Sequence, residues 1–228
     1  MLDKAYKYAL GMGRWCGVAQ NVRRHFKIAK AYPLDWWIVE WESLELLLSE
    51  DFAQLFQPEN LAVDTESNNV FCAHYGIQHA HDFIRDVNGH LIDDLAGQVP
   101  LLQEKYRSLL DRMDLAFAGS EVLVVRESLR TTRELEAGIS AAETEARARR
   151  LLAVLAARWP TTRIDLLVLE GGADRADIPV GEHRIAIDSL EDLNEAGQWR
   201  AEAWDRVFER QAVRPMGART PLAQLAQG

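Results

Sequence analysis

Residues 122–125 read Val122-Leu123-Val124-Val125, an unbroken apolar run of the kind expected in a β-strand buried on both faces. A predicted amphipathic helix over Val99–Phe117 precedes this run, and Gly119 would end that helix. A second predicted helix, Ala141–Arg158, leads to another apolar run at Ile164–Leu169. Strands that alternate with helices of this length indicate an α/β fold with parallel crossovers.

The same alternation extends in both directions along the chain. A short strand over Tyr6–Leu10 would run into a glycine loop, and helices are expected over Cys16–Phe26 and Ser43–Phe56. Downstream, His183–Ile187 is expected to form a third buried strand, with a helix over Gln198–Gln211 behind it. We therefore predict a three-layer α/β fold, Rossmann-like, with a mostly parallel central sheet flanked by helices.

The length favours one compact core. A chain of 228 residues lies between one large domain and two small ones, and we predict a single α/β domain over residues 1–212. Residues 213–228 contain Pro, Gly and Gln without a periodic pattern and are predicted to form a loosely ordered tail.

The composition is that of an ordinary globular protein. With 48% hydrophobic and 27% charged residues, the disordered, collagen-like and disulfide-rich classes are excluded. The net charge is −9, the pI is near 5.2 and no dense Lys/Arg stripe occurs, so binding to nucleic acid or to an anionic membrane is not expected. The longest apolar run, Leu151–Ala157, falls short of the roughly 20 residues that cross a bilayer.

The N-terminus lacks the charged region and apolar core of a signal peptide, so we expect a cytoplasmic protein with two free thiols. The expected partner is a small-molecule, peptide or glycan-linked substrate. No cofactor and no metal are expected, and the oligomeric state is left open.

Cys16 stands where a glycine loop gives way to a predicted helix. The free amides and the positive end of the helix dipole favour an anion there, which suits a nucleophilic thiolate. The alternatives are a small buried hydrophobe, or a degenerate dinucleotide fingerprint in which Gly11 and Gly13 precede a phosphate-binding helix. Gly11, Gly13 and Gly17 are therefore candidate substrate-binding residues, whereas Cys72 lies in an apolar strand-like run and is predicted to pack in the core.

Three histidines, His74, His79 and His81, fall within eight residues. An imidazole can take a proton from a thiol and return it to a leaving group. Asp82 follows directly, but adjacent side chains on an extended segment point opposite ways, which leaves open that it serves another group. Two alternatives remain: a metal site built on His79 and His81 on one face of a strand, for which a third ligand is missing, and histidines without a catalytic role.

Three separated motifs now line up along the chain. They are Leu10-Gly11-Met12-Gly13-Arg14-Trp15-Cys16 followed by Val22-Arg23-Arg24, then Pro33-Leu34-Asp35-Trp36, then His79-Ala80-His81-Asp82-Phe83. In this order they resemble a bacterial family described as papain-like cysteine peptidases, whose pattern is Ser-Leu-Gly-x-x-Cys with a following Leu-Arg, a Pro-Phe-Asp-Trp turn and a His-Asp element. The chain departs from that pattern by a longer gap before Cys16 if Gly11 of Leu10-Gly11 is the motif glycine, and by Leu34 in place of Phe. Neither departure removes a reacting group.

The resemblance implies that Cys16 is the nucleophile and His81 the base, with His79 as its competitor. Asp35 and Asp82 then become candidates to orient the imidazole, and Trp36 becomes a candidate substrate contact. Papain-like enzymes pair a helical half with an antiparallel barrel-like half, whereas the second half of this chain alternates strands and helices. The expected fold therefore follows the periodicity, and the expected chemistry follows the resemblance.

The leading hypothesis is a thiol-dependent hydrolase or acyl transferase with a Cys16–His81 dyad, in which amides at the start of the helix stabilise the oxyanion. The alternative is an α/β domain that binds a nucleotide sugar or phosphorylated glycan. There Arg126, at the end of a buried strand, would hold anionic oxygens, although a salt bridge to Asp188 is equally compatible with its position. A third hypothesis is an interaction module that docks through tryptophans, among Trp36, Trp37, Trp41, Trp199 and Trp204.

Overall fold

A computed structural model describes residues 1–92, 94–118, 121–128, 140–171, 175–190 and 201–217. The helices are α1 (Cys16–Phe26), α2 (Trp41–Ser49), α3 (Leu95–Phe117), α5 (Ala141–Arg158) and α6 (Ala201–Arg210), with short 3₁₀ turns η1 (Pro33–Trp36) and η2 (Pro58–Asn60). The strands are β1 (Lys4–Tyr6), β2 (Tyr8–Gly11), β3 (Leu61–Asp64), β4 (Asn69–Cys72), β5 (Ile77–His79), β6 (Glu121–Ser128), β7 (Arg163–Gly171), β8 (Ala176–Val180), β9 (His183–Leu190) and β10 (Val213–Pro215).

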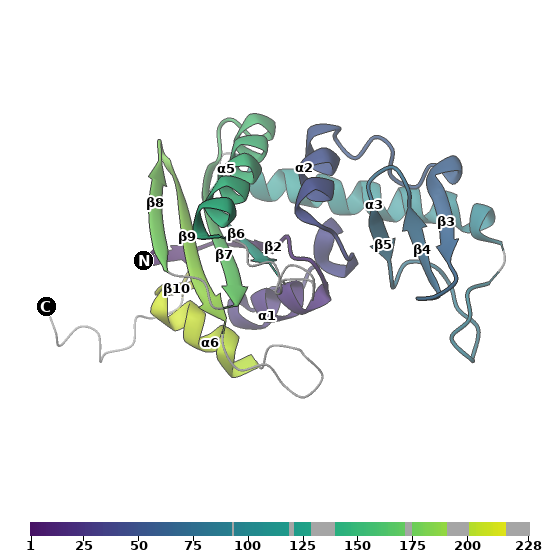
Figure 1. The fold of residues 1–228 in the computed structure, drawn as a ribbon, viewed down its shortest axis with the longest axis horizontal. Coiled ribbons are helices and arrows are strands. Elements are labelled where there is room, and N and C mark those ends of the chain that lie inside the picture. Colours follow the sequence, from purple (N-terminus) through teal and green to yellow (C-terminus); the bar gives the residue numbers. More distant parts are fainter. Residues whose placement is uncertain (93, 119–120, 129–139, 172–174, 191–200, 218–228) are drawn as a thin grey trace, which may run out of the picture.

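The main sheet has the strand order β2-β6-β7-β9-β8 (Figure 1). The pairs β2–β6, β6–β7 and β7–β9 are parallel. The edge strand β8 is antiparallel to β9, so the sheet is mixed. The three apolar runs of the sequence form the buried centres of β6, β7 and β9, as expected for strands covered on both faces. Sequence analysis missed β8, an edge strand whose residues are only partly buried and which contains Pro179.

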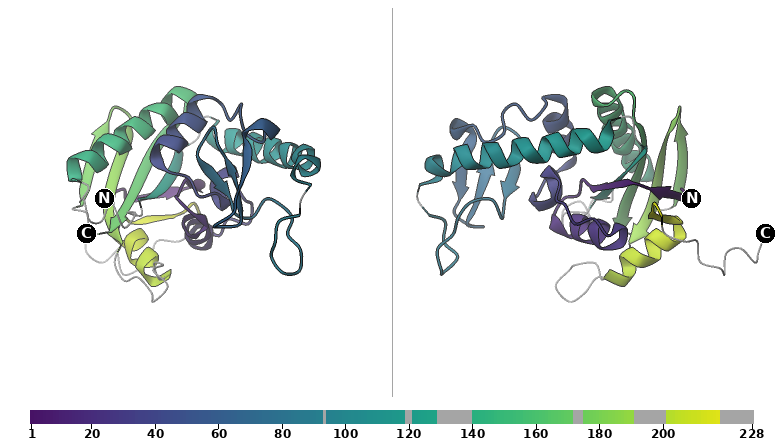
Figure 2. Two further views of the ribbon diagram at one scale, coloured as in Figure 1. Left: turned by 45° about the vertical axis from the view of Figure 1, so that its right-hand side comes forward. Right: turned by 180° about the vertical axis from the view of Figure 1, so that it is seen from behind.

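Helices cover both faces of this sheet (Figures 1 and 2). Because side chains alternate along a strand, Val122 and Val124 pack with α2, α3 and α5, whereas Leu123 and Val125 pack with α1 and α6. The parallel strands are added in one direction, whereas a Rossmann sheet reverses its strand order at the ligand-binding crevice. The α/β layering is therefore confirmed, but the strand order does not support the Rossmann-like part of the prediction.

A second, smaller sheet consists of β3, β4 and β5, which are antiparallel. Its strands are only three or four residues long, too short to show a clear period, and the sequence did not predict them as a sheet. Helix α3 extends from this small sheet to the main sheet (Figure 2). The helix predicted over Ser43–Phe56 was wrong beyond α2, because Asp51 and Phe52 adopt left-handed backbone angles (φ 53° and 60°) that end it.

The two ends of the described chain meet in a parallel pair of strands, in which β1 lies beside β10 and Lys4 is opposite Val213. The first residues of the predicted tail are therefore part of a strand, and residues 218–228 lie outside the described part. The division into one domain and a tail remains a prediction. Trp199 and the first residues of the helix predicted over Gln198–Gln211 also lie outside the described residues.

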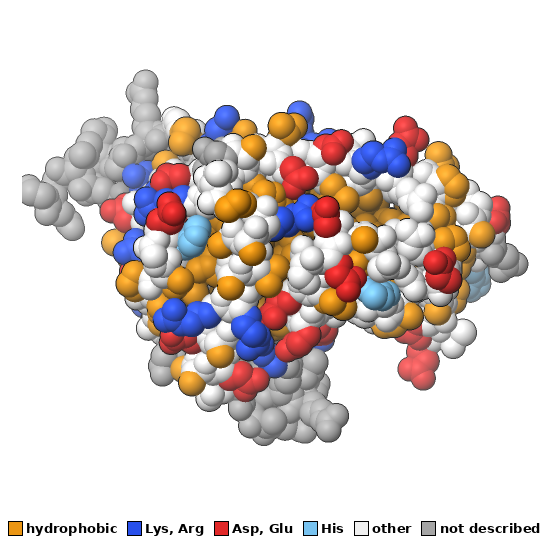
Figure 3. Space-filling model, turned by 90° about the horizontal axis from the view of Figure 1, so that it is seen from above, with side chains coloured by type: hydrophobic (Ala, Val, Ile, Leu, Met, Phe, Trp, Pro, Cys, Tyr) orange, Lys and Arg blue, Asp and Glu red, His pale blue; other side chains and the backbone are white. Residues whose placement is uncertain are grey.

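Three arginines of α5, Arg147, Arg149 and Arg150, form ion pairs with neighbouring glutamates. Arg147 Nε lies 3.9 Å from Glu42 Oε1, and Arg150 Nε lies 3.3 Å from Glu45 Oε2. These two ion pairs join α5 to α2. Seen from above, acidic and basic side chains are interspersed over the molecule (Figure 3). Among the described residues, none of the helices is long and apolar enough to cross a membrane.

Two glycines let the loop after β2 approach α1 closely. A Cβ atom added at Gly11 would lie 3.0 Å from the backbone of Ala19. One added at Gly13 would lie 2.0 Å from Cγ2 and 2.4 Å from Cβ of Val18, a residue buried in the first turn of α1. These glycines therefore set how tightly the first turn of α1 packs on the chain that leads to Cys16.

We predict that Gly13→Ala lowers the free energy of unfolding by about 1–3 kcal/mol, the usual effect of overpacking a core. Gly17→Ala is the matched control, since the nearest neighbour of its Cβ would be the Trp15 side chain, at 3.3 Å, and the substitution would raise helix propensity. Urea unfolding of both variants tests this. Equal stabilities for the two would contradict the packing role of Gly13.

Candidate functional site

Cys16 is the first residue of α1, half-buried, and follows Trp15, which provides no side-chain cap. The first amide groups of a helix have no acceptor within the helix, so those of Cys16 and Gly17 are available to an oxyanion. Among the described residues, the Cys16 thiol makes no hydrogen bond to an imidazole. Cys72, in contrast, is fully buried in β4, and burial raises the pKa of its thiol.

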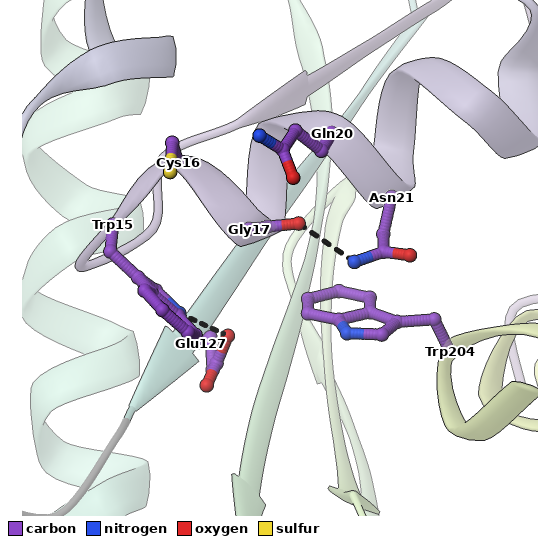
Figure 4. A pocket seen from close by; sticks show the side chains of 7 residues that line it. All are labelled: Trp15, Cys16, Gly17, Gln20, Asn21, Glu127 and Trp204. Carbon is purple, nitrogen blue, oxygen red and sulfur yellow. Dashed lines mark hydrogen bonds between the residues drawn. The ribbon is translucent and has the colours of Figure 1, made fainter. Parts of the chain in front are cut away.

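A pocket of about 170 Å³ opens beside Cys16. Figure 4 shows Trp15 and Glu127 on one side of it, Asn21 and Trp204 on the other, and the first turns of α1 between them. Trp15 Nε1 donates a hydrogen bond of 3.2 Å to Glu127 Oε2. The complete lining is Trp15, Cys16, Gly17, Gln20, Asn21, Glu127 and Trp204.

The loop before Cys16 is held by a buried arginine. Arg126, on β6 and only 1% exposed, donates hydrogen bonds of 2.7 Å to the Met12 carbonyl and 2.9 Å to the Val39 carbonyl. Its guanidinium lies 4.9 Å from the centre of the Trp41 ring, and burial lowers its pKa to about 10, so it stays charged at neutral pH.

This placement does not support the predicted role of Arg126 as a contact for anionic oxygens, because the side chain is sealed inside the protein. The predicted ion pair with Asp188 is also absent among the described residues. Asp188 instead lies 2.9 Å from Arg210 and accepts a hydrogen bond of 2.7 Å from Gln211.

The segment around Val39, which accepts one of the Arg126 hydrogen bonds, also connects the loop before Cys16 to the small sheet. Val39 N–H donates to the Arg14 carbonyl at 3.0 Å. The preceding residue, Ile38, exchanges backbone hydrogen bonds of 3.2 and 3.1 Å with Gln78 of β5. A continuous set of backbone contacts therefore leads from the Cys16 loop to the residue before His79.

His79 is fully buried at the end of β5 among aromatic rings. Its ring centre lies 4.7 Å from that of Phe56 and 5.4 Å from that of Trp37. Nδ1 lies 3.1 Å from Asp82 Oδ2, and Nε2 has no partner among the described residues. Asp82 therefore orients His79 and not its sequence neighbour His81. This agrees with the opposite directions of adjacent side chains on an extended segment.

Asp82 accepts four hydrogen bonds. Besides His79, its donors are Trp37 Nε1 at 2.8 Å, Lys105 Nζ at 2.7 Å and the Tyr106 hydroxyl at 2.7 Å. Burial alone would raise the pKa of Asp82, but the hydrogen bonds and charges of His79 and Lys105 hold it well below its usual range. Asp82 is therefore a buried anion that joins Trp37, which directly follows η1, to β5 and α3.

His81 lies beyond the end of β5 and is exposed. Its ring meets the Trp36 ring edge-on at 5.9 Å, and the Arg23 guanidinium of α1 lies 6.0 Å from the same indole. Arg23 follows Cys16 by about two helical turns and so shares its face of α1. The expectation that His79 and His81 occupy one face of a strand was wrong, because the strand ends at His79 and a turn follows.

Asp35 has a different role from the one predicted. It is 1% exposed, accepts a hydrogen bond of 3.1 Å from the Tyr32 amide, and lies 3.7 Å from Arg23. Burial raises the pKa of Asp35 to about 6. Asp35 therefore ties η1 to α1 and makes no hydrogen bond to an imidazole among the described residues. Nor do these residues contain a group of three or more His, Cys, Asp or Glu that could hold a metal ion.

The sequence did not identify five of the residues that line the pocket: Trp15, Gln20, Asn21, Glu127 and Trp204. The signal for Glu127 was present: it follows Arg126 at the carboxyl end of a predicted strand, and alternation directs its side chain to the opposite face, where α1 lies. Gly17 does line the pocket as predicted for a substrate contact, whereas Gly11 and Gly13 pack against α1.

The family described as "Putative papain-like cysteine peptidase (DUF1796)" matches residues 7–154, more than half of the chain. The match begins just before β2 and ends within α5, so it includes Cys16, η1 and the histidine segment. Neither a curated protein nor a solved structure matches the chain.

The two buried carboxylates predict opposite dependences of stability on pH. The pKa of Asp82 is lowered on folding, so its contribution is present above the unfolded pKa of about 3.9 and falls at lower pH. Asp82→Asn is expected to lose about 3 kcal/mol at pH 7, the scale of hydrogen bonds to a charged group, and less near pH 3.

Asp35→Asn is the matched comparison. The folded pKa of about 6 lies above the ordinary value of 3.8 for an aspartate side chain. Ionisation of Asp35 therefore opposes folding, and the wild type should lose up to about 3 kcal/mol relative to Asp35→Asn between about pH 4 and pH 6. Urea titrations across this range measure both differences. Parallel pH profiles for the two variants would show that the carboxylates share one environment and would contradict the assignment.

Proposed function

Because this chain belongs to the family described as putative papain-like cysteine peptidases, we propose that it is a thiol-dependent hydrolase of peptide amides, with Cys16 as nucleophile and His81 as proton carrier. The observation that carries the proposal is the pocket that opens at Cys16, in the first turn of α1. A half-buried thiol beside free helix amides and an open pocket has the access that a nucleophile needs.

The proposed reaction has two steps. Cys16 Sγ attacks the substrate carbonyl carbon while its proton passes to the His81 imidazole, and the oxyanion is stabilised by the amides of Cys16 and Gly17. The C–N bond then breaks, and the leaving amine takes the proton from the imidazolium. Water, deprotonated by the same imidazole, hydrolyses the thioester and releases the acid and the free thiol.

His81 is favoured over His79 because it is accessible. His79 is enclosed by Trp37, Phe56 and Phe83 and is engaged with Asp82. His81, in contrast, is exposed beside Trp36, whose indole lies 6.0 Å from the Arg23 guanidinium of α1. The Asp82 hydrogen bonds fix the turn on which His81 stands, so Asp82 and His79 act as positioning residues.

The alternative functions have less support. Arg126 is buried, and the pocket beside Cys16 is smaller than the roughly 300–1,000 Å³ typical of sites for larger ligands, which disfavours a nucleotide-sugar site there. Trp37, Trp41 and Trp204 are buried and Trp36 is half-buried, so these four do not form an exposed docking surface. A peptide substrate is therefore the proposed partner.

We predict that Cys16→Ala lowers the turnover of a fluorogenic peptide-amide library to background, since the nucleophile is lost. His81→Gln is expected to lower turnover by about a hundredfold or more, the usual contribution of a general base. In the native wild type, iodoacetamide should modify Cys16, whereas Cys72 should react only in urea. Peptide mapping by mass spectrometry identifies the modified thiol.

His90→Gln is the matched control, because His90 is an exposed histidine that follows the small sheet. It should retain the wild-type rate within about twofold, as expected for a surface substitution. Full activity in Cys16→Ala, or equal losses in His81→Gln and His90→Gln, would refute the proposed dyad.

A further inference from the structure

The hydrogen bond between Trp15 and Glu127 lies directly beside the residue that carries the thiol (Figure 4). We propose that Glu127 is a positioning residue of the reaction, which holds the Trp15 indole against the first turn of α1 and thereby fixes Cys16 and the adjacent amides at the pocket. The inference rests on the proposed function and adds to it a residue that acts through another side chain.

Three consecutive residues of β6 hold the loop that leads to Cys16. The Met12 amide donates a hydrogen bond of 2.8 Å to the Val125 carbonyl, and Arg126 donates one of 2.7 Å to the Met12 carbonyl. The third residue, Glu127, accepts a hydrogen bond of 3.2 Å from Trp15 Nε1. The first two contacts fix the start of the loop, and the third fixes the residue directly before the thiol.

Trp15 depends on Glu127 for its orientation. Trp15 is the N-cap residue of α1, and its side chain makes no capping hydrogen bond to the helix. An indole has a single donor and no acceptor, so the bond to Glu127 uses all of its hydrogen-bonding capacity. A half-buried indole held at that one atom has its ring direction set by the carboxylate.

The ring held in this way lies against the turn that carries the reacting groups. A Cβ atom added at Gly17 would lie 3.3 Å from Cε2 and 3.5 Å from Nε1 of Trp15, so the indole takes the space of a side chain at Gly17. The amide of Gly17 is one of the two proposed to stabilise the oxyanion. A fixed ring therefore supports the helix start exactly where preorganised donors are needed.

The carboxylate is itself held firmly. Glu127 is 2% exposed and stands on β6, which lies between β2 and β7 in the main sheet. Burial lowers the pKa of the neighbouring Arg126, and the charges of Glu40 and Glu127 oppose that shift. Removal of the Glu127 charge thus also acts on Arg126, so the test must separate the hydrogen bond from the charge.

A double-mutant cycle on the full-length protein measures the contribution of this bond. Trp15→Phe keeps a ring and removes the donor, whereas Glu127→Met keeps the length of the side chain and removes the acceptor. Each variant should lower kcat for a fluorogenic peptide amide by at least about tenfold and change KM by less than about threefold, because orientation of the reacting groups is lost. The double variant should match the slower single variant within about twofold, because both substitutions remove the same bond.

Glu127→Gln separates the hydrogen bond from the charge. Its amide oxygen can still accept from the indole, so kcat should recover to within about threefold of the wild type although the charge beside Arg126 is gone. This variant and Trp15→Phe keep the test decisive if Glu127→Met does not fold.

Trp159→Phe is the matched control. Trp159 Nε1 donates a hydrogen bond of 3.0 Å to Asp114 Oδ1, the same kind of contact, and Trp159 does not line the pocket beside Cys16. Urea unfolding should show similar losses of stability in Trp159→Phe and Trp15→Phe, whereas Trp159→Phe should keep the wild-type kcat within about twofold. A merely structural role of the Trp15 bond would lower both rates equally.

The outcomes distinguish the inference from the proposed function. Wild-type turnover that is unchanged in Trp15→Phe, additive losses in the double variant, or an equal loss in Trp159→Phe would overturn the role of Glu127 alone. A kcat for Glu127→Gln as low as that for Glu127→Met would also overturn it, since the charge and not the hydrogen bond would then matter. Absence of turnover in the wild type would instead refute the proposed function, and the inference with it.

Discussion

The buried guanidinium of Arg126 is the constraint on which the rest of the site depends. It makes two short hydrogen bonds to carbonyl groups of segments that come from different parts of the chain, Met12 and Val39. A charge in the interior is costly unless it is hydrogen-bonded, and these two bonds stabilise the guanidinium, whose Nε has no partner among the described residues. Arg126 therefore fixes the loop that enters α1 and, through Ile38 and Gln78, the small sheet with its histidines. The proposed nucleophile follows a strand of the main sheet and the proposed base follows a strand of the small sheet, and this group of contacts joins the two sheets.

The histidine segment has a support of its own. Asp82 accepts hydrogen bonds from Trp37, which follows η1, and from residues of β5 and α3, and His79 packs among the aromatic rings beside it. A carboxylate with four donors can stay ionised in the interior, since each donor favours the charged form. The buried pair thus has a structural role, and His81, which lies between them in the sequence, is exposed to solvent. His79 is buried because it packs beside Asp82, whereas His81 lies past the end of β5 and is exposed.

Local patterns predicted the long elements well. Helix Cys16–Phe26 and helix Ala141–Arg158 were predicted with the bounds observed in α1 and α5, because the apolar spacing and the flanking residues agree there. The small sheet was missed, since its strands are three or four residues long and contain no regular alternation. The role of Arg126 was also missed: its partners are backbone carbonyls, which carry no sequence signal. Sequence alone therefore placed the thiol correctly at a helix start, but it could not identify which side chains surround it.

Hydrogen exchange in Arg126→Met tests most directly whether this guanidinium joins the two sheets. Methionine fills the space but leaves the Met12 and Val39 carbonyls without their donors. Loss of hydrogen bonds to a charged group should lower the protection of the Val39, Ile38 and Gln78 amides by at least about tenfold, while amides in the centre of β7 keep theirs. Unchanged protection at these three amides, or an equal loss throughout the main sheet, would contradict the account.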